Sequence, residues 1–177
     1  MKKGLVVFQS KYGATEKYAR WLAETMDYDC LPRADARADL CAPYEILVYG
    51  GGIYASGIAG FSFIRHHAAH WKNKKIAVFC VGASPHDEKA FAELCSRYFK
   101  GELADIPRFY CRGAWKESAM RFTDRTLCKM LRKAVLGKSP EEYEPWERAL
   151  MSCPPGEDAD WTDPAELAPL ISYLKKG

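Results

Sequence analysis

The sequence has no large excess of charge of one sign and no regular cysteine spacing. Its 177 residues carry a formal net charge of +3, far from the strongly basic composition of a dedicated nucleic-acid-binding protein. The seven cysteines are an odd number without a short repeated spacing, which argues against the disulfide framework of a small secreted protein. A hydrophobic share of 48% and a charged share of 28% exclude a disordered chain. We therefore expect a cytoplasmic folded domain with no nucleic-acid partner.

Long hydrophobic runs are also scarce. The apolar run at residues 5–8, which follows Met1-Lys2-Lys3, is too short for the core of a signal peptide. Residues 46–64 carry no charge, which is nominally enough length to span a bilayer. Glycines interrupt this segment at positions 50, 51, 52, 57 and 60. That composition favours a buried strand, a tight loop and the start of a helix over a continuous transmembrane helix.

Several site motifs are missing. The chain has neither the Walker spacing, a glycine four residues before Gly-Lys-Ser/Thr, nor the Gly-x-Gly-x-x-Gly dinucleotide motif. No cysteine is followed six residues later by arginine, which excludes the Cys-x5-Arg phosphatases. The helical histidines His66, His67 and His70 lack a nearby carboxylate or cysteine, so we expect no metal site there.

What the sequence does contain is an alternation of short apolar runs with amphipathic segments. The runs predict strands at 4–9, 28–31, 45–49, 76–81 and 108–111. Helices are expected at 16–26, from the glycine-rich loop 50–57 to about Trp71, after an N-cap at Ser84, and after a cap at Asp163. This alternation predicts a single α/β domain over residues 1–177, with a doubly wound parallel sheet of five strands and helices on both faces.

One segment breaks the alternation, and we interpret residues 113–161 as a largely helical insert before the last helix. Residues 116–138 hold seven basic and two acidic side chains, a net charge of +5. Residues 141–166 hold nine acidic side chains and one arginine, a net charge of −8. The basic segment either contacts a partner or an anionic membrane surface, or is neutralised internally by the acidic segment.

The loop after the first predicted strand is a candidate phosphate-binding site. It runs Ser10-Lys11-Tyr12-Gly13-Ala14-Thr15 and leads directly into a helix. Hydroxyls at Ser10 and Thr15, with Gly13 allowing backbone amides to close on an oxygen, form a phosphate cradle at a helix N-terminus. The alternative interpretation is an ordinary N-cap turn. Because the dinucleotide motif is missing, a monophosphate fits better.

Two further loops are expected at the same edge of the sheet, because the carboxyl ends of parallel strands meet there. The glycine-rich loop 50–57 follows the third strand, and residues 82–86 follow the fourth. Together with the first loop they can enclose a planar ring, with Tyr54 or Ile53 offering a face. The alternative for Tyr54 is a partly exposed loop aromatic without a ligand.

These loops and the order of elements resemble the flavodoxin family over residues 1–112 and the final helix. The insert adds a closer similarity, because Gly113-Ala114, then Arg121-Phe122-Thr123-Asp124-Arg125, then a basic helix ending at Gly137, resemble the flavodoxin-like, quinone-linked protoporphyrinogen oxidases of bacteria. The resemblance implies a strand order of 2-1-3-4-5 and a noncovalently bound FMN. The implied FMN-binding residues are Ser10, Lys11, Tyr12, Gly13, Ala14 and Thr15 for the phosphate, and Gly51, Gly52, Ile53, Tyr54, Ala55, Gly82, Ala83 and Ser84 around the ring.

The function implied is redox chemistry on FMN, as an oxidoreductase or an electron-transfer protein with a protein or quinone partner. No side chain stands out as a catalytic acid or base. The chain also lacks the strongly acidic composition typical of electron-carrier flavodoxins. The alternatives are protoporphyrinogen oxidation with a quinone acceptor and, in another class, a flavin-free scaffold or interaction module.

Overall fold

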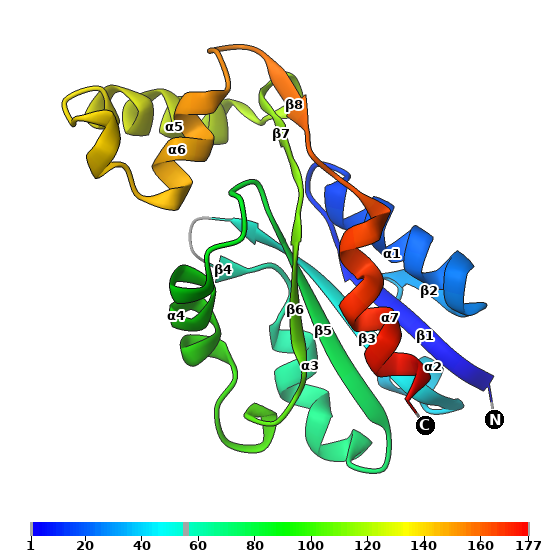
Figure 1. The fold of residues 1–177 in the computed structure, drawn as a ribbon. Helices are drawn as coiled ribbons and strands as arrows, with labels where there is room; N and C mark the ends of the chain where they lie inside the picture. The colour runs from blue at the N-terminus through cyan, green and yellow to red at the C-terminus, as the bar shows by residue number, and fades with distance from the viewer. Residues whose placement is uncertain (1, 55–56, 177) are drawn as a thin grey trace.

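A twisted parallel sheet lies at the centre of the computed structural model, which describes residues 2–54 and 57–176 (Figure 1). Its neighbouring strands follow the order β2-β1-β3-β5-β6, and each of these pairings is parallel. The strands are β1 (Lys2–Gln9), β2 (Asp29–Pro32), β3 (Tyr44–Tyr54), β5 (Lys75–Gly82) and β6 (Arg108–Arg112). The predicted doubly wound parallel sheet of order 2-1-3-4-5 is therefore confirmed, although the short β4 (Gly57–Ile58), which pairs with β3, makes the sheet six-stranded instead of five-stranded.

Side chains alternate between the two faces of the sheet, and each face has its own apolar core. In β1, Leu5 and Val7 belong to one core while Val6 and Phe8 belong to the other. The first core is covered by α2 (Ala38–Cys41), α3 (Ser62–His67) and α4 (Glu88–Tyr98), and the second by α1 (Ala14–Met26) and α7 (Ala168–Lys175). Because the strands are buried on both sides, they read as continuous apolar runs in the sequence.

The predicted glycine-rich loop at 50–57 is wrong in part, because β3 continues through all three glycines to Tyr54. It then pairs antiparallel with β4, and Ala55 and Ser56 lie outside the described residues. Gly50 is the residue that close packing requires here. A Cβ on Gly50 would lie 2.2 Å from the Phe79 ring on the neighbouring strand β5. Glycine in this strand therefore reflects a close aromatic contact in the core.

The start of α4 also differs from the prediction. The N-cap is Asp87, whose side chain accepts a hydrogen bond from the Ala90 amide at 2.8 Å, while Ser84 and Pro85 stay in the preceding loop. Because the helix begins later, the loop after β5 is longer than expected and leaves Ser84 free to contribute its backbone to the edge of the sheet. The predicted cap at Asp163 is confirmed: its carboxylate accepts from the Ala165 amide at 2.8 Å, at the start of η5 (Pro164–Leu167).

The segment 113–161 contains two helices and a small two-stranded sheet. The helices are α5 (Phe122–Val135) and α6 (Pro145–Ser152), and β7 (Ala114–Lys116) pairs antiparallel with β8 (Asp158–Asp160). The helical character was predicted, but the strand pair was not. It ties the two ends of the insert together, so that α5 and α6 project beyond the carboxyl edge of the main sheet (Figure 1).

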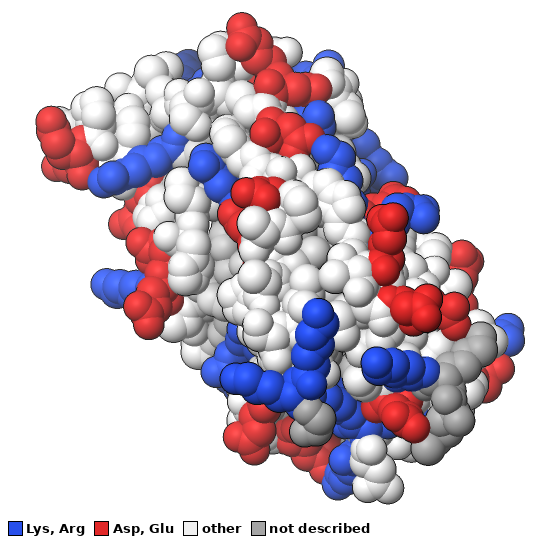
Figure 2. Space-filling view, turned by 45° about the vertical axis from the view of Figure 1, so that its right-hand side comes forward, with Lys and Arg blue, Asp and Glu red and all other residues white. Residues whose placement is uncertain are grey.

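Charge is mixed over the molecular surface. Basic and acidic side chains both occur across the face shown in Figure 2, and much of its middle is uncharged. The uniform acidity of an electron-carrier flavodoxin is not seen on this face. Within the described part of the chain, no helix has the length and apolarity needed to cross a bilayer, and the longest, α5, has 14 residues.

Candidate functional site

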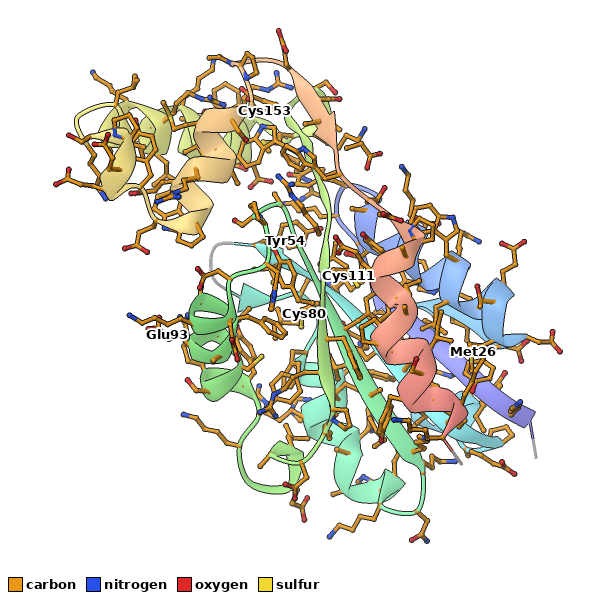
Figure 3. The ribbon with its side chains drawn as sticks, viewed as in Figure 1. Met26, Tyr54, Cys80, Glu93, Cys111 and Cys153 are labelled. Carbon is orange, nitrogen blue, oxygen red and sulfur yellow. The ribbon has the colours of Figure 1, made fainter. Side chains whose placement is uncertain are left out.

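The three predicted loops meet at the carboxyl ends of β1, β3 and β5, where Tyr54 lies in Figure 3. Contacts between their side chains and backbones show how close they are. The Tyr54 ring lies against Gly52 and reaches the first loop. A Cβ on Gly82 would lie 3.3 Å from Ile53 Cδ1. The structure therefore brings the predicted residues of all three loops together, apart from Ala55, which is outside the described residues.

The loop from Ser10 to Thr15 has the geometry of a tight turn into a helix. Gly13 has a φ of 95°, a left-handed conformation that glycine adopts without strain, and its amide donates to Ser10 Oγ at 3.0 Å. Helix α1 begins at the next residue, Ala14, and Thr15 is buried with 1% of its surface exposed. The free amides of this first helical turn point their partial positive charge at the loop, which favours an anion there.

The Tyr54 hydroxyl completes this loop. Its oxygen accepts a hydrogen bond from the Lys11 backbone amide at 2.9 Å, and its ring meets the Tyr12 ring edge to face at 6.0 Å. Burial raises the pKa of Tyr54, so the phenol stays protonated at neutral pH. A backbone amide of the predicted phosphate cradle is thus already directed at an oxygen acceptor. Tyr54 is partly exposed, as one interpretation of the sequence allowed, but it lies at the end of β3 and its hydroxyl contacts the first loop.

The third loop is held by residues of β6 and by Gly113 directly after it. The Gly113 amide donates to the Gly82 carbonyl at 2.7 Å, and the Tyr110 hydroxyl donates to the Ser84 carbonyl at 2.5 Å. The Arg112 side chain reaches the carbonyl of Ala83 at 3.4 Å. Because these bonds occupy the carbonyl groups, the loop has a fixed position at the edge of the site.

Arg112 also lies at this edge, and no sequence pattern predicted it as a residue of the site. Its guanidinium lies 4.4 Å above the Trp161 ring, and its own amide donates to the Glu166 carboxylate. Trp161 comes from the far end of the insert, and its amide donates to the Gly113 carbonyl at 3.1 Å. A cation held beside the loop after β5 favours a ligand that carries or gains negative charge.

Asp124 of the insert is the second residue that sequence analysis did not place in the site. The Lys11 ammonium and the Tyr12 hydroxyl both donate to Asp124 Oδ2. The hydrogen bond from Lys11 is the main cause that lowers the pKa of Asp124 below its usual range. The N-terminal turn of α5 is therefore fastened directly to the predicted phosphate loop.

Arg125, the residue after this aspartate, holds the start of α5 in place. Its guanidinium donates to the carbonyl groups of Glu117 at 3.1 Å and Ser118 at 3.0 Å, which holds α5 against the chain that leads into it. Asp124 is thereby positioned toward the first loop. The aromatic residue of the same motif, Phe122, is 84% exposed and contacts neither loop.

Other candidate groups lie away from this edge. Cys80 and Cys111 are fully buried in β5 and β6 (Figure 3), where burial raises the pKa of each thiol, that of Cys111 to about 12. They are core residues, as expected. His67 packs on the rings of Phe63 and Trp71, and the described residues contain no group of three or more side chains suited to hold a metal ion.

Comparison with known proteins decides the family. Residues 5–142, more than three quarters of the chain, match the family described as the flavodoxin domain. The chain belongs to the flavodoxin domain family. FMN is the cofactor that this membership indicates. No curated protein matches the chain.

The chain is similar to several solved structures at low identity. The Trp repressor binding protein of Bacillus subtilis is 15% identical, with a TM-score of 0.45 over 63% of this flavodoxin domain chain and 83% of that one. The two-electron reduced flavodoxin of Megasphaera elsdenii is 16% identical, with a TM-score of 0.46 over 60% and 82%. Oxidised flavodoxin 1 of Bacillus cereus is 16% identical, with a TM-score of 0.40 over 62% and 84%. None of these comparisons supports the closer resemblance to the protoporphyrinogen oxidases.

The first loop of the site fits the phosphate of a flavin in one respect. The first loop of this flavodoxin domain directs the Lys11 amide at the oxygen of Tyr54, so the loop is built to donate to an oxygen acceptor. Three glycines, Gly51, Gly52 and Gly82, lie beside this loop. A Cβ on each would collide with a side chain of the protein itself, namely Ile58, Tyr54 and the Tyr110 hydroxyl, at 2.6 Å.

Proposed function

We propose that this chain is an FMN-dependent redox protein, an oxidoreductase or electron carrier, whose partner is a protein or a quinone. The observation that carries the proposal is the hydrogen bond from the Lys11 amide to the Tyr54 oxygen, at the N-terminus of α1 in a flavodoxin domain. It supports a loop made for an oxyanion with an aromatic ring at its side. When bound, FMN would supply the one- and two-electron chemistry, and the protein supplies its position and electrostatic surroundings.

Each part of the site has its own role in this proposal. The first-loop residues Ser10, Gly13 and Thr15 bind the phosphate, with the dipole of α1 favouring its charge. Gly51, Gly52 and Ile53 of β3, with Gly82 at the end of β5 and Ala83 and Ser84 after it, flank the ring. Arg112 adds positive charge, which would stabilise the flavin when it gains an electron, whereas the charge of Lys11 is balanced by Asp124. The mixed surface charge suits a partner that does not depend on a uniformly acidic face, and the cytoplasm remains the compartment that we propose.

The test is a comparison of FMN with riboflavin, which lacks only the phosphate. Purified protein freed of flavin is titrated with each compound, and quenching of flavin fluorescence is followed. Charge-assisted hydrogen bonds are worth about 1.5–3 kcal/mol each, so we expect FMN to bind at least tenfold more tightly. Thr15→Val keeps the volume of Thr15 and removes its hydroxyl. It should reduce the difference in affinity between FMN and riboflavin. If neither flavin binds, the protein is instead the flavin-free scaffold.

Protoporphyrinogen oxidation with a quinone acceptor is a second candidate. The observation that favours it is that the aromatic-x-Asp-Arg segment contacts the phosphate loop through Asp124, so the part of the insert that resembles those enzymes belongs to the site. Turnover of protoporphyrinogen with added quinone by flavin-loaded protein would support it. Flavin binding without such turnover would leave the general redox function and reject this one.

A further inference from the structure

The insert carries most of the exposed apolar bulk of the molecule. Six large apolar side chains are exposed among the described residues, and five of them lie in the insert: Phe122, Leu127, Met130, Leu136 and Trp146. The sixth, Leu40, lies on α2. Exposure is greatest at Phe122, at 84%, and at Met130, at 66%. Large exposed apolar side chains gathered on one element mark an interaction site more often than scattered ones do.

Three of these side chains, Phe122, Leu127 and Met130, lie on the outer side of α5. At about 100° per residue, Met130 is about 80° and Leu127 about 140° around the helix from Phe122, so the three spread over one broad side of it. On the opposite face, Val135 is buried and the Arg132 side chain is only 12% exposed. Helix α5 thus has one side packed within the insert and an apolar side that is left open, at the end of the molecule away from the main sheet (Figure 1).

Two lysines lie beside Phe122 on the outer side of α5. Lys129 and Lys133 follow Phe122 by seven and eleven residues, which places them next to it on the helix. Both are exposed, and neither forms an ion pair within residues 2–54 and 57–176. The outer face of α5 therefore combines exposed apolar side chains with two lysines that form no ion pair among the described residues.

The acidic part of the insert neutralises other basic residues. Arg132 pairs with Glu117 at 3.4 Å, and Lys138 pairs with Glu147 at 2.6 Å. Arg125 is occupied by backbone carbonyl groups. Internal neutralisation, one of the alternatives raised by the sequence, thus accounts for the inner basic side chains of this segment. Among the described residues it leaves Arg121, Lys129 and Lys133 without an ion pair.

We propose that the outer face of α5 binds the surface of a membrane that contains anionic lipids. Phe122, Leu127 and Met130 would enter the boundary between headgroups and acyl chains, while the lysines contact lipid phosphates. A fluid surface accommodates side chains of unequal length on a single protruding helix, whereas an acidic protein partner would need a groove that matches them. This binding goes beyond the redox proposal and does not depend on it. If both hold, Asp124, fastened to the first loop, places the flavin site close to a lipid-dissolved acceptor such as a quinone.

The experiment is flotation of the full-length protein with vesicles of phosphatidylcholine alone or of phosphatidylcholine with phosphatidylglycerol, at low and at physiological salt. We expect binding to the anionic vesicles that weakens with salt. Lys129→Gln/Lys133→Gln should reduce the vesicle affinity about five-fold for each lysine, or roughly twenty-five-fold together. Phe122→Ser/Met130→Ser should reduce it at least ten-fold even at low salt.

Two control variants make the same chemical changes elsewhere. Lys89→Gln/Lys100→Gln removes two exposed lysines near the ends of α4, and Leu40→Ser removes the exposed leucine of α2. Both should leave vesicle binding unchanged. Thermal unfolding of every variant shows whether it is folded, and none of these side chains is buried.

Four results would overturn the proposal. The first is that the wild-type protein fails to float with anionic vesicles at low salt. The second is that Phe122→Ser/Met130→Ser binds as well as the wild type, because adsorption would then be electrostatic only. The third is sedimentation of the protein as a dimer that this variant dissociates without any effect on vesicle binding, since the face would then join two copies. The fourth is binding to polyglutamate but not to vesicles, which would indicate an acidic protein partner.

Discussion

Replacing Tyr54 with phenylalanine should tighten FMN binding, although it removes a polar group from the site. In the structure the phenolic oxygen accepts the hydrogen bond of the Lys11 amide, at 2.9 Å. A phosphate that uses the amides of this loop has to displace that oxygen first. Breaking the bond is a cost of binding that the phenylalanine variant does not have, so its FMN-free state is less stable while its FMN-bound state is unchanged.

The size of the effect follows from the type of bond. A neutral hydrogen bond contributes about 0.5–1.5 kcal/mol net, so the dissociation constant for FMN should fall about two- to ten-fold in Tyr54→Phe. Tyr54→Ala also removes the aromatic ring, whose stacking is worth about 0.5–1.5 kcal/mol. In that variant the two changes oppose each other, and we expect no gain in affinity.

The assay is fluorescence titration of flavin-free protein with FMN, together with urea unfolding without flavin. Tyr54→Phe should lower the free energy of unfolding by about 1 kcal/mol and tighten FMN binding. Tyr28→Phe is the matched control, because the buried Tyr28 hydroxyl has no hydrogen-bond partner among the described residues. It should leave FMN binding unchanged and the stability equal or higher. Weaker FMN binding by Tyr54→Phe would refute the reasoning, since the hydroxyl would then serve the bound state.

Two further predictions concern stability. Burial alone would raise the pKa of Asp160, but hydrogen bonds from Lys17, at 2.5 Å, and Thr162 lower it to about 2. A carboxylate with a lowered pKa stabilises the fold at pH values above its pKa in the unfolded chain, which is near 4. This stabilisation is lost as the pH falls to about 2. At pH 7, Asp160→Asn should thus lower the free energy of unfolding by about 1–2 kcal/mol, allowing for solvent screening. In urea unfolding, the difference in this free energy between variant and wild type should be constant from pH 7 to 5 and should narrow below pH 4. A difference that does not depend on pH would contradict this. Gly50→Ala forces its Cβ into the ring of Phe79 and should lower the free energy of unfolding by about 1–3 kcal/mol in the same assay. At Gly137 the nearest atom would lie 3.5 Å from an added Cβ, so Gly137→Ala should lower it by less than about 0.5 kcal/mol. Equal losses in the two variants would refute the packing argument.

The regular elements of the sheet were predictable because their signal is local. Residues 4–9 and 76–81 are apolar runs bounded by turns, and a strand buried on both faces needs nothing more. The glycines at 50–52 misled the prediction, because glycine marks a turn in most sequences. Here the close packing of Phe79 over Gly50 keeps them in a strand, and that contact joins residues 29 positions apart.

Some residues of the candidate site could likewise be predicted from a local segment, and others could not. Ser10–Thr15 could be predicted from sequence, since one short segment contains the hydroxyls, the glycine and the helix start that a phosphate loop needs. Asp124 and Arg112 could not, although both residues are charged. Asp124 meets Lys11 across 113 positions of chain, and Arg112 meets Trp161 only because the strand pair β7–β8 returns the insert to the sheet.

Local sequence patterns are enough to predict a doubly wound α/β domain with a loop suited to phosphate, because hydrophobic periodicity and turn chemistry act over a few neighbouring residues. The pairing of charges in the insert depends instead on how the chain packs. Packing pairs Arg132 and Lys138 with acidic partners and leaves Lys129 and Lys133 beside an open apolar face. Charge counts along a chain give the number of opposite charges, whereas pairing depends on distances of a few ångströms that packing alone sets.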